Sequence, residues 1–214
     1  MDDKTSFILA LSCAIPALLG IFKYKNSASN YRSFLLLMVI ALITELISGI
    51  PVLVSKNYAP LRLAYAIYPT IEIFLLLLFF KRNKIVTYKN FAWCVAVIVA
   101  LIYIISFLFT HTTNNTATNY CDISTTVIVL ILSVKMLSNE IFETKVAAFK
   151  NPKMIIAFGY IFFNSFELLD QVFLHFNSQR NIYLNIFMVY QIPNMLSYII
   201  FTWAIIWIPQ KVKY

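Results

Sequence analysis

The sequence predicts an all-α fold, a single bundle of seven membrane-spanning helices over residues 1–214, and three observations predict it. Hydrophobic residues make up 61% of the 214 residues and charged residues 12%, with a mean hydropathy of +0.79. An average soluble chain is about half apolar and about a quarter charged. The apolar residues fall into long continuous runs, unlike the short alternating strands of a β-barrel. The connections between the runs are short, so we expect no soluble catalytic or nucleic-acid-binding domain.

Each run is long enough to cross a bilayer as a helix, because a hydrocarbon core of about 30 Å needs roughly 20 mostly apolar residues. The third run ends at the bases Lys81 and Arg82. The fifth run is the least regular, because Lys135 and Glu140 crowd its end. The longest connections are 111–121 and 142–153. In order along the chain, the predicted spans are 6–24, 33–55, 61–80, 91–110, 122–141, 154–176 and 183–208.

The distribution of basic residues predicts the orientation, because lysine and arginine concentrate in cytoplasmic loops. With the N-terminus outside, four bases lie in outer segments: Lys4, Lys56, Arg62 and Arg180. The inner segments then hold twelve: Lys23, Lys25, Arg32, Lys81, Arg82, Lys84, Lys89, Lys145, Lys150, Lys153, Lys211 and Lys213. Tryptophan favours membrane interfaces, and Trp93, Trp203 and Trp207 fall near the inner boundary. We therefore expect a multi-pass protein of the inner (plasma) membrane, with an uncleaved first span and a cytoplasmic C-terminus.

Several chemistries are excluded by missing motifs. The sequence has no glycine-rich phosphate loop, no His-Glu-x-x-His, no Cys-x-x-Cys and no Gly-x-Ser-x-Gly. Its two histidines, His111 and His175, lie near Cys121 and Asp122 at the predicted outer edge, and we interpret them as interfacial polar residues. We therefore expect no metal, no cofactor and no catalytic residue. The net charge of +8 is explained by attraction of the loops to anionic lipid, without nucleic acid.

Acidic residues inside the predicted spans are the informative positions. A charged side chain at the bilayer centre costs at least about 2.5 kcal/mol on insertion scales, so such residues mark candidate functional sites. At 1.5 Å per helical residue, Glu45, Glu72 and Glu167 lie near the middle of their spans, and Asp170 lies one turn further out. Other polar residues share their helix faces at steps of three or four. Together they predict a ligand pocket of Glu45, Tyr68, Glu72, Glu167, Asp170, Gln191 and Asn194.

Three hypotheses account for these buried polar residues. The first is protonated or hydrogen-bonded contacts between helices. The second is a polar cavity for a small-molecule or cation ligand, with tyrosine rings offering cation–π contacts. The third is a proton relay or acid–base chemistry. Four acids on three spans are more than a single contact between helices needs. The cavity hypothesis is therefore as well supported as the hypothesis of contacts between helices.

An internal repeat is a further hypothesis. An offset of 122 residues places Glu45 on Glu167, Tyr68 on Tyr190 and Glu72 on Asn194. Pro69 and Pro193 lie two positions out of that register. The offset predicts three spans, a linker span and three spans in parallel orientation, an arrangement found in repeat-built transporters.

In the segment 65–82, Tyr65 is followed by six residues and then by Glu72, and the apolar run after Glu72 ends in bases. This segment resembles the third span of small bacterial seven-helix membrane proteins. The run from Asn151 to Tyr160 resembles their sixth span. These largely uncharacterised proteins are similar to membrane-sensor modules associated with histidine kinases. The resemblance implies seven helices and a sensory or accessory role, and it carries over no catalytic residue. Since the chain ends at Tyr214, we expect any kinase to be a separate signalling subunit.

The expected function is a non-enzymatic sensory or accessory module with the acidic pocket at the bilayer midplane. The alternatives are a small-solute facilitator or proton-coupled transporter and, second, a membrane-embedded enzyme acting on a lipid.

Overall fold

The structure is a computed structural model that describes residues 7–210 apart from 8, 10, 57–58, 89, 111–115, 144–146 and 177–179. These residues form seven α-helices and no strand, which confirms the all-α class. Three short 3₁₀-helices, η1 (Leu11–Cys13), η2 (Ser29–Tyr31) and η3 (Ala148–Lys150), precede α2, α3 and α7. The α-helices are α2 (Ala14–Tyr24), α3 (Arg32–Ser55), α4 (Ala59–Arg82), α5 (Phe91–Thr110), α6 (Thr116–Glu143), α7 (Pro152–Phe176) and α8 (Arg180–Trp207).

The helix bounds follow the predicted apolar runs closely at α3, α5 and α7, and α5 coincides with 91–110. The start differs from the predicted one at α2, an α-helix from Ala14 that follows η1 rather than beginning at residue 6, and at α6, which begins at Thr116 rather than at Asp122. The polar residues of its first turns have low hydropathy, but a helix needs only satisfied backbone hydrogen bonds and not apolar side chains. Asp122 is therefore well inside a helix.

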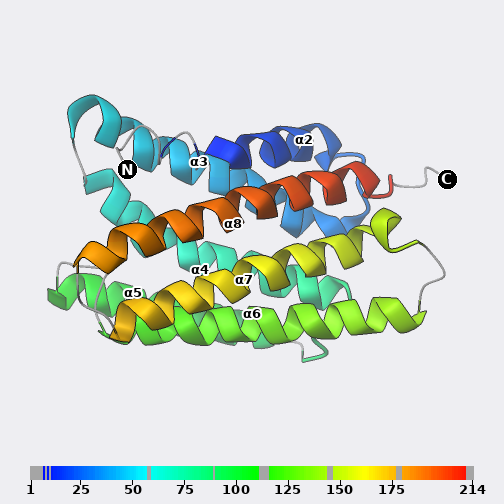
Figure 1. The fold of residues 1–214 in the computed structure, drawn as a ribbon. Helices are drawn as coiled ribbons and strands as arrows, with labels where there is room; N and C mark the ends of the chain where they lie inside the picture. The colour runs from blue at the N-terminus through cyan, green and yellow to red at the C-terminus, as the bar shows by residue number, and fades with distance from the viewer. Residues whose placement is uncertain are drawn as a thin grey trace.

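Consecutive helices run antiparallel, and they form two groups of three (Figure 1). In the first group α3 packs between α2 and α4, and in the second α7 packs between α6 and α8. The last helix of each group contacts the first helix of the other group, because α8 packs on α2 and α4 packs on α6. The helix α5 links the groups along its contacts with α4 and α6.

This antiparallel order brings the basic segments to one end of the bundle, which we call the basic end. Hydrogen bonds join four of these segments there. The Ala28 N–H donates to the Pro209 carbonyl at 3.1 Å, and Arg82 Nη1 donates to the Ser29 carbonyl at 3.2 Å. Trp203 Nε1 donates to the Phe149 carbonyl at 3.0 Å. The loops predicted to share one side of the membrane thus lie together.

An aromatic cluster connects the two groups in the buried core. Phe34 of α3 lies 5.8 Å from Phe79 of α4 and 5.5 Å from Phe201 of α8, measured between ring centroids. Tyr160 of α7 lies 4.8 Å from Phe201. All four side chains are buried. We call these four residues the aromatic cluster.

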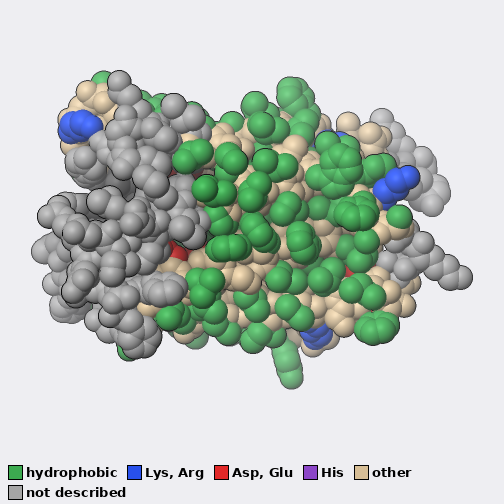
Figure 2. All heavy atoms as spheres, in the orientation of Figure 1, with side chains coloured by type: hydrophobic (Ala, Val, Ile, Leu, Met, Phe, Trp, Pro, Cys, Tyr) green, Lys and Arg blue, Asp and Glu red, His purple; other side chains and the backbone are tan. Residues whose placement is uncertain are grey.

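The described surface is largely apolar. Figure 2 shows hydrophobic side chains over most of the described face, with few charged side chains among them. Exposed examples on three different helices are Ile131, Phe158 and Ile199. Within the described residues, the helical segments Ser29–Ser55, Thr118–Glu143 and Pro152–Val172 are long and apolar enough to cross a membrane.

Candidate functional site

Four carboxyl side chains from three helices form an acidic cluster, consisting of Glu72 on α4, Asp122 on α6, and Glu167 and Asp170 on α7. Glu167 interacts electrostatically with the other three. Glu72 also interacts with Asp122. The cluster therefore joins the third helix of the first group to the first two helices of the second group.

Hydroxyl groups are the hydrogen-bond donors that reach this acidic cluster. Thr126 Oγ1 donates to Glu167 Oε2 at 3.3 Å. The Tyr103 hydroxyl of α5 donates to Asp122 Oδ1, and the Tyr68 hydroxyl lies within hydrogen-bonding reach of Glu72. A hydroxyl donor partly stabilises a carboxylate but does not neutralise its charge.

Three tyrosines connect Glu45 on α3 to the acidic cluster. Tyr68 and Tyr198 each interact electrostatically with both Glu45 and Glu72. Tyr160 interacts with Glu72 and Tyr198. Glu45 thus reaches the cluster through phenol groups rather than by a direct carboxyl contact.

The Tyr160 hydroxyl is one of two buried polar groups on α7 that lack a hydrogen-bond partner among the described residues, and Gln171 Oε1 is the other. Tyr160 is 2% exposed, and its hydroxyl has no hydrogen-bond partner among the described residues. An unsatisfied buried hydroxyl costs about 1–3 kcal/mol. Because it lies beside Glu72, it can donate to or accept from a small molecule bound there.

The predicted pocket residues are placed as follows. Glu72, Glu167 and Asp170 lie together in the acidic cluster, Tyr68 lies beside Glu72, and Glu45 is connected through tyrosines. Asn194 is half-buried on α8, one helical turn before Tyr198 and on the same face. The side chain of Gln191 lies outside the described residues. Of the seven, the six described are all half-buried.

The sequence interpretation missed Asp122, Thr126, Tyr103, Tyr160 and Tyr198 as site residues. A signal for the first two was present, because Asp122 and Thr126 are four residues apart and therefore share a helix face. It was missed because the predicted span began at Asp122, where an acid reads as an interfacial residue. The tyrosines carried no signal, because their spacing does not differ from that of packing aromatics.

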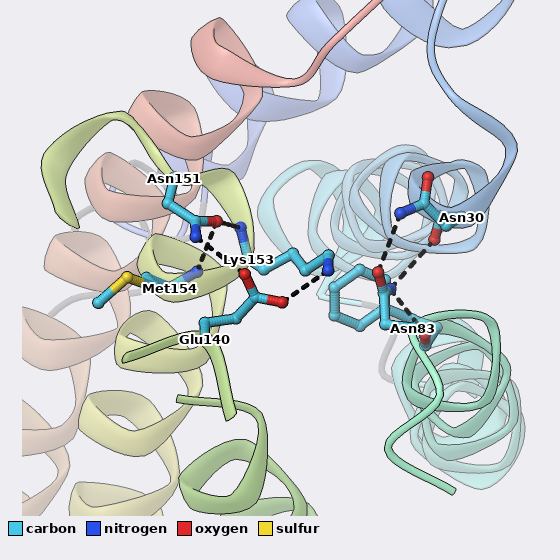
Figure 3. Close-up of polar contacts among 7 residues, drawn as sticks. Asn30, Asn83, Glu140, Asn151, Lys153 and Met154 are labelled. Atoms are coloured by element: carbon cyan, nitrogen blue, oxygen red, sulfur yellow. Dashed lines mark hydrogen bonds and ion pairs between the residues drawn. The ribbon is translucent and has the colours of Figure 1, made fainter. Parts of the chain in front are cut away.

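A second polar group of residues closes the basic end (Figure 3). Lys153 Nζ of α7 lies 2.6 Å from Glu140 Oε1 of α6, and Asn151 Nδ2 donates to Glu140 Oε2 at 2.9 Å. Nearby, Asn30 Nδ2 donates to Asn83 Oδ1 at 2.9 Å. Glu140, Asn151 and Asn83 are buried. We call Glu140, Asn151 and Lys153 the basic-end clamp.

No described lysine or arginine forms an ion pair with the acidic cluster. Lys153 pairs with Glu140, and Lys135 Nζ of α6 donates to the Ile85 carbonyl at 3.0 Å. Among the described residues, no group of three His, Cys, Asp or Glu side chains is placed to hold a metal ion.

Comparison with known proteins identifies no relative of this chain. No protein-family model, curated protein or solved structure matches the chain.

Proposed function

We propose that the chain is a multi-pass protein of the inner (plasma) membrane whose seven helices all span the bilayer, with the N-terminus outside. Its apolar composition supports this proposal, as do the three helical segments long enough to cross a membrane and the apolar surface of Figure 2. The gathering of basic segments at one end supports a cytoplasmic position for that end, because cytoplasmic loops are enriched in lysine and arginine.

Within this setting, we propose a non-enzymatic sensory or accessory module that binds a small organic cation in a pocket at the acidic cluster. The single observation that carries the proposal is the electrostatic interaction among Glu72, Asp122 and Glu167, from three helices, where the hydrogen-bond donors among the described residues are hydroxyl groups. Uncompensated carboxylates in an apolar interior are costly. A bound cation removes that cost, and the free Tyr160 hydroxyl supplies a hydrogen bond.

Signal transfer follows from the helices that the ligand would join. A cation between Glu72 and Glu167 contacts α4 and α7, and both helices continue to the basic end. Binding would therefore change the relative position of Arg82 at the end of α4 and of the basic-end clamp at the start of α7. A separate cytoplasmic signalling subunit that docks on the basic end would detect this change.

The test is cation binding by the detergent-purified chain, with methylammonium and tetramethylammonium chloride as probes and sodium chloride as the ionic-strength control. We expect thermal stabilisation by at least one alkylammonium probe. We expect Glu72→Gln and Glu167→Gln to weaken binding by about tenfold or more, because each removes a charge-assisted contact. The matched control is Glu143→Gln, because Glu143 is an exposed acid at the end of α6. Equal weakening by all three variants, or no alkylammonium effect on the wild type, would contradict the proposal.

A small-solute transporter is the second candidate, and the reciprocal packing of the two helix groups favours it. The internal repeat of three helices, a linker and three helices is supported by the α2–α8 and α4–α6 contacts. Each contact also carries a lysine bound to carbonyls of the other group, since Lys23 donates to Ile205 and Lys135 to Ile85. Pro69 and Pro193 lie inside α4 and α8, where each proline removes a backbone N–H donor, although both helices continue through the proline.

Uptake into proteoliposomes distinguishes the two candidates. A transporter releases radiolabelled methylammonium on the far side of the vesicle membrane, so accumulation exceeds the amount of protein present. A sensor only binds the probe, so the uptake never exceeds one equivalent per chain.

A further inference from the structure

We propose that a cavity at the basic end, between the ends of α2 and α8, binds the phosphate group of an anionic phospholipid. The cavity has a volume of about 110 Å³ and is lined by Phe22, Lys23, Asn26, Ser27, Ile208 and Gln210. A water molecule occupies about 30 Å³ of the liquid, so the space holds more than one water and admits a compact polar group. The inference rests on the proposed membrane residence and is independent of the acidic cluster.

The chemistry of the lining fits an anion. One side chain is cationic, Lys23, and two are amides with N–H donors, Asn26 and Gln210. Among the described residues, no acid lines the cavity. The Ser27 hydroxyl donates to the Tyr24 carbonyl at 3.0 Å, so it is already engaged. An anion in this cavity therefore meets donors and positive charge, without a carboxylate to repel it.

Lys23 is held in place for this role. Its Nζ donates to the Ile205 carbonyl at 2.9 Å and to the Ile206 carbonyl at 2.6 Å, both in the last turn of α8. An ammonium group has three N–H donors, so these two bonds leave one for a ligand. The half-buried lysine is thus ordered before a ligand arrives, which reduces the entropy that binding would cost.

The surroundings identify the anion as the headgroup of a lipid. Phe22, at the mouth of the cavity, is 78% exposed. On α2, the exposed residues Ile15, Leu18 and Phe22 recur at steps of three and four and so form one apolar stripe that ends at the cavity. A second exposed stripe on α8 is formed by Ile192, Leu196, Ile199, Trp203 and Ile206.

These two stripes offer an apolar surface on which the acyl chains of a phospholipid can pack while its headgroup occupies the cavity. The helices that carry the two stripes, α2 and α8, pack against each other and lie side by side in Figure 1. Trp203 and Trp207 lie near the same level, and tryptophan favours the membrane interface. A phospholipid placed with its phosphate at Lys23 would extend its chains along both helices. A free inorganic phosphate would use the lysine and the amides but none of the apolar surface.

The test is native mass spectrometry of the detergent-purified full chain mixed with phosphatidylglycerol or phosphatidylcholine. We expect the wild type to retain phosphatidylglycerol preferentially, and Lys23→Gln to lower its occupancy about tenfold, because it removes a charge-assisted hydrogen bond to the phosphate. The matched control is Lys25→Gln, which removes the same charge from an exposed lysine two residues away that does not line the cavity. It should leave occupancy within about twofold, because Lys25 is exposed and salt screens its attraction to the headgroup.

A second variant keeps the test valid if Lys23→Gln destabilises the end of α8. Gln210→Leu places an apolar side chain in the cavity and leaves Lys23 and its carbonyl partners intact, and it should also lower phosphatidylglycerol occupancy. Equal losses in Lys23→Gln and Lys25→Gln would overturn the site in favour of diffuse attraction. If millimolar inorganic phosphate displaced the lipid, the identification of the ligand as a phospholipid would be overturned in favour of a free anion. Absence of lipid retention by a chain that still fractionates with membranes would overturn the site but not the membrane residence.

Discussion

Two kinds of carboxyl side chain lie inside the bundle, and their partners distinguish them. Glu140 has a lysine nitrogen at 2.6 Å and an amide nitrogen at 2.9 Å. Glu167 has the Thr126 hydroxyl at 3.3 Å and three other carboxyls within electrostatic reach. The compensated acid stabilises the fold at the basic end. The uncompensated acids are the ones for which we propose a ligand.

The basic-end clamp gives a stability prediction. Lys153→Ala removes the lysine nitrogen 2.6 Å from the 5% exposed Glu140, and removing one partner of a partly buried ion pair costs about 1–3 kcal/mol. We expect a lower melting temperature in detergent for Lys153→Ala. The control Lys25→Ala, at an exposed lysine, should melt like the wild type. The double variant Lys153→Met with Glu140→Gln should recover part of the loss, and a double variant less stable than Lys153→Ala would refute the ion-pair explanation.

Single residues were predictable from the sequence where a polar side chain interrupts an apolar helix. Glu72, Glu167 and Asp170 stand out in this way, and the structure brings these three together. Asp122 was not predicted, because it follows a polar segment in which one more acid carries no signal. Tyr160 and Tyr198 were not predicted either, because only packing decides whether an aromatic hydroxyl reaches a carboxyl or the surface.

At the scale of elements, the close approach of α7 and α8 depends on a glycine. A Cβ atom built at Gly159 would lie 2.5 Å from Phe201 Cε1 and 3.2 Å from Ile200 Cγ2. The Phe201 ring is held in the aromatic cluster between Phe34 and Tyr160, so it cannot move aside without disturbing the buried core.

We therefore expect Gly159→Ala to destabilise the bundle. Overpacking costs about 1–3 kcal/mol, which exceeds the gain of up to about 1 kcal/mol in helix propensity. The matched control is Gly20→Ala on α2, where the added Cβ would meet its nearest neighbour, the Leu35 carbonyl oxygen, at 3.4 Å. Melting temperatures of both variants in detergent check this prediction. A Gly159→Ala variant as stable as Gly20→Ala would show that α8 can shift at this contact.

The helices themselves were predictable because their length is set by local physics. A long apolar run has to satisfy its backbone hydrogen bonds within the segment, and a helix does so without a partner. The bounds of α3, α5 and α7 follow from this rule. The start of α6 does not, because the polar residues 116–121 can be helical or not, and the apolar pattern does not distinguish the two cases.

At the scale of the whole molecule, the proposed orientation predicts a labelling pattern. In a Cys94→Ser background, which removes the exposed cysteine, Lys25→Cys at the basic end should react with a membrane-impermeant maleimide only in inverted vesicles. Lys56→Cys, which follows α3 at the opposite end, should react in intact cells. The reverse pattern would mean that the basic end faces outward. Reaction of both positions from one side would contradict a bundle that spans the bilayer.

The sequence by itself determined the apolar helical class and the position of each acid along its helix. Both depend on local properties, namely side-chain hydropathy and a helical rise that is the same everywhere. Only the tertiary structure decided which helix faces meet. It joined Asp122 to Glu72 and Glu167, paired Glu140 with Lys153, and formed the Lys23 cavity between α2 and α8. The physical reason is that contacts between distant segments depend on how all the side chains pack together, and no local spacing specifies that packing.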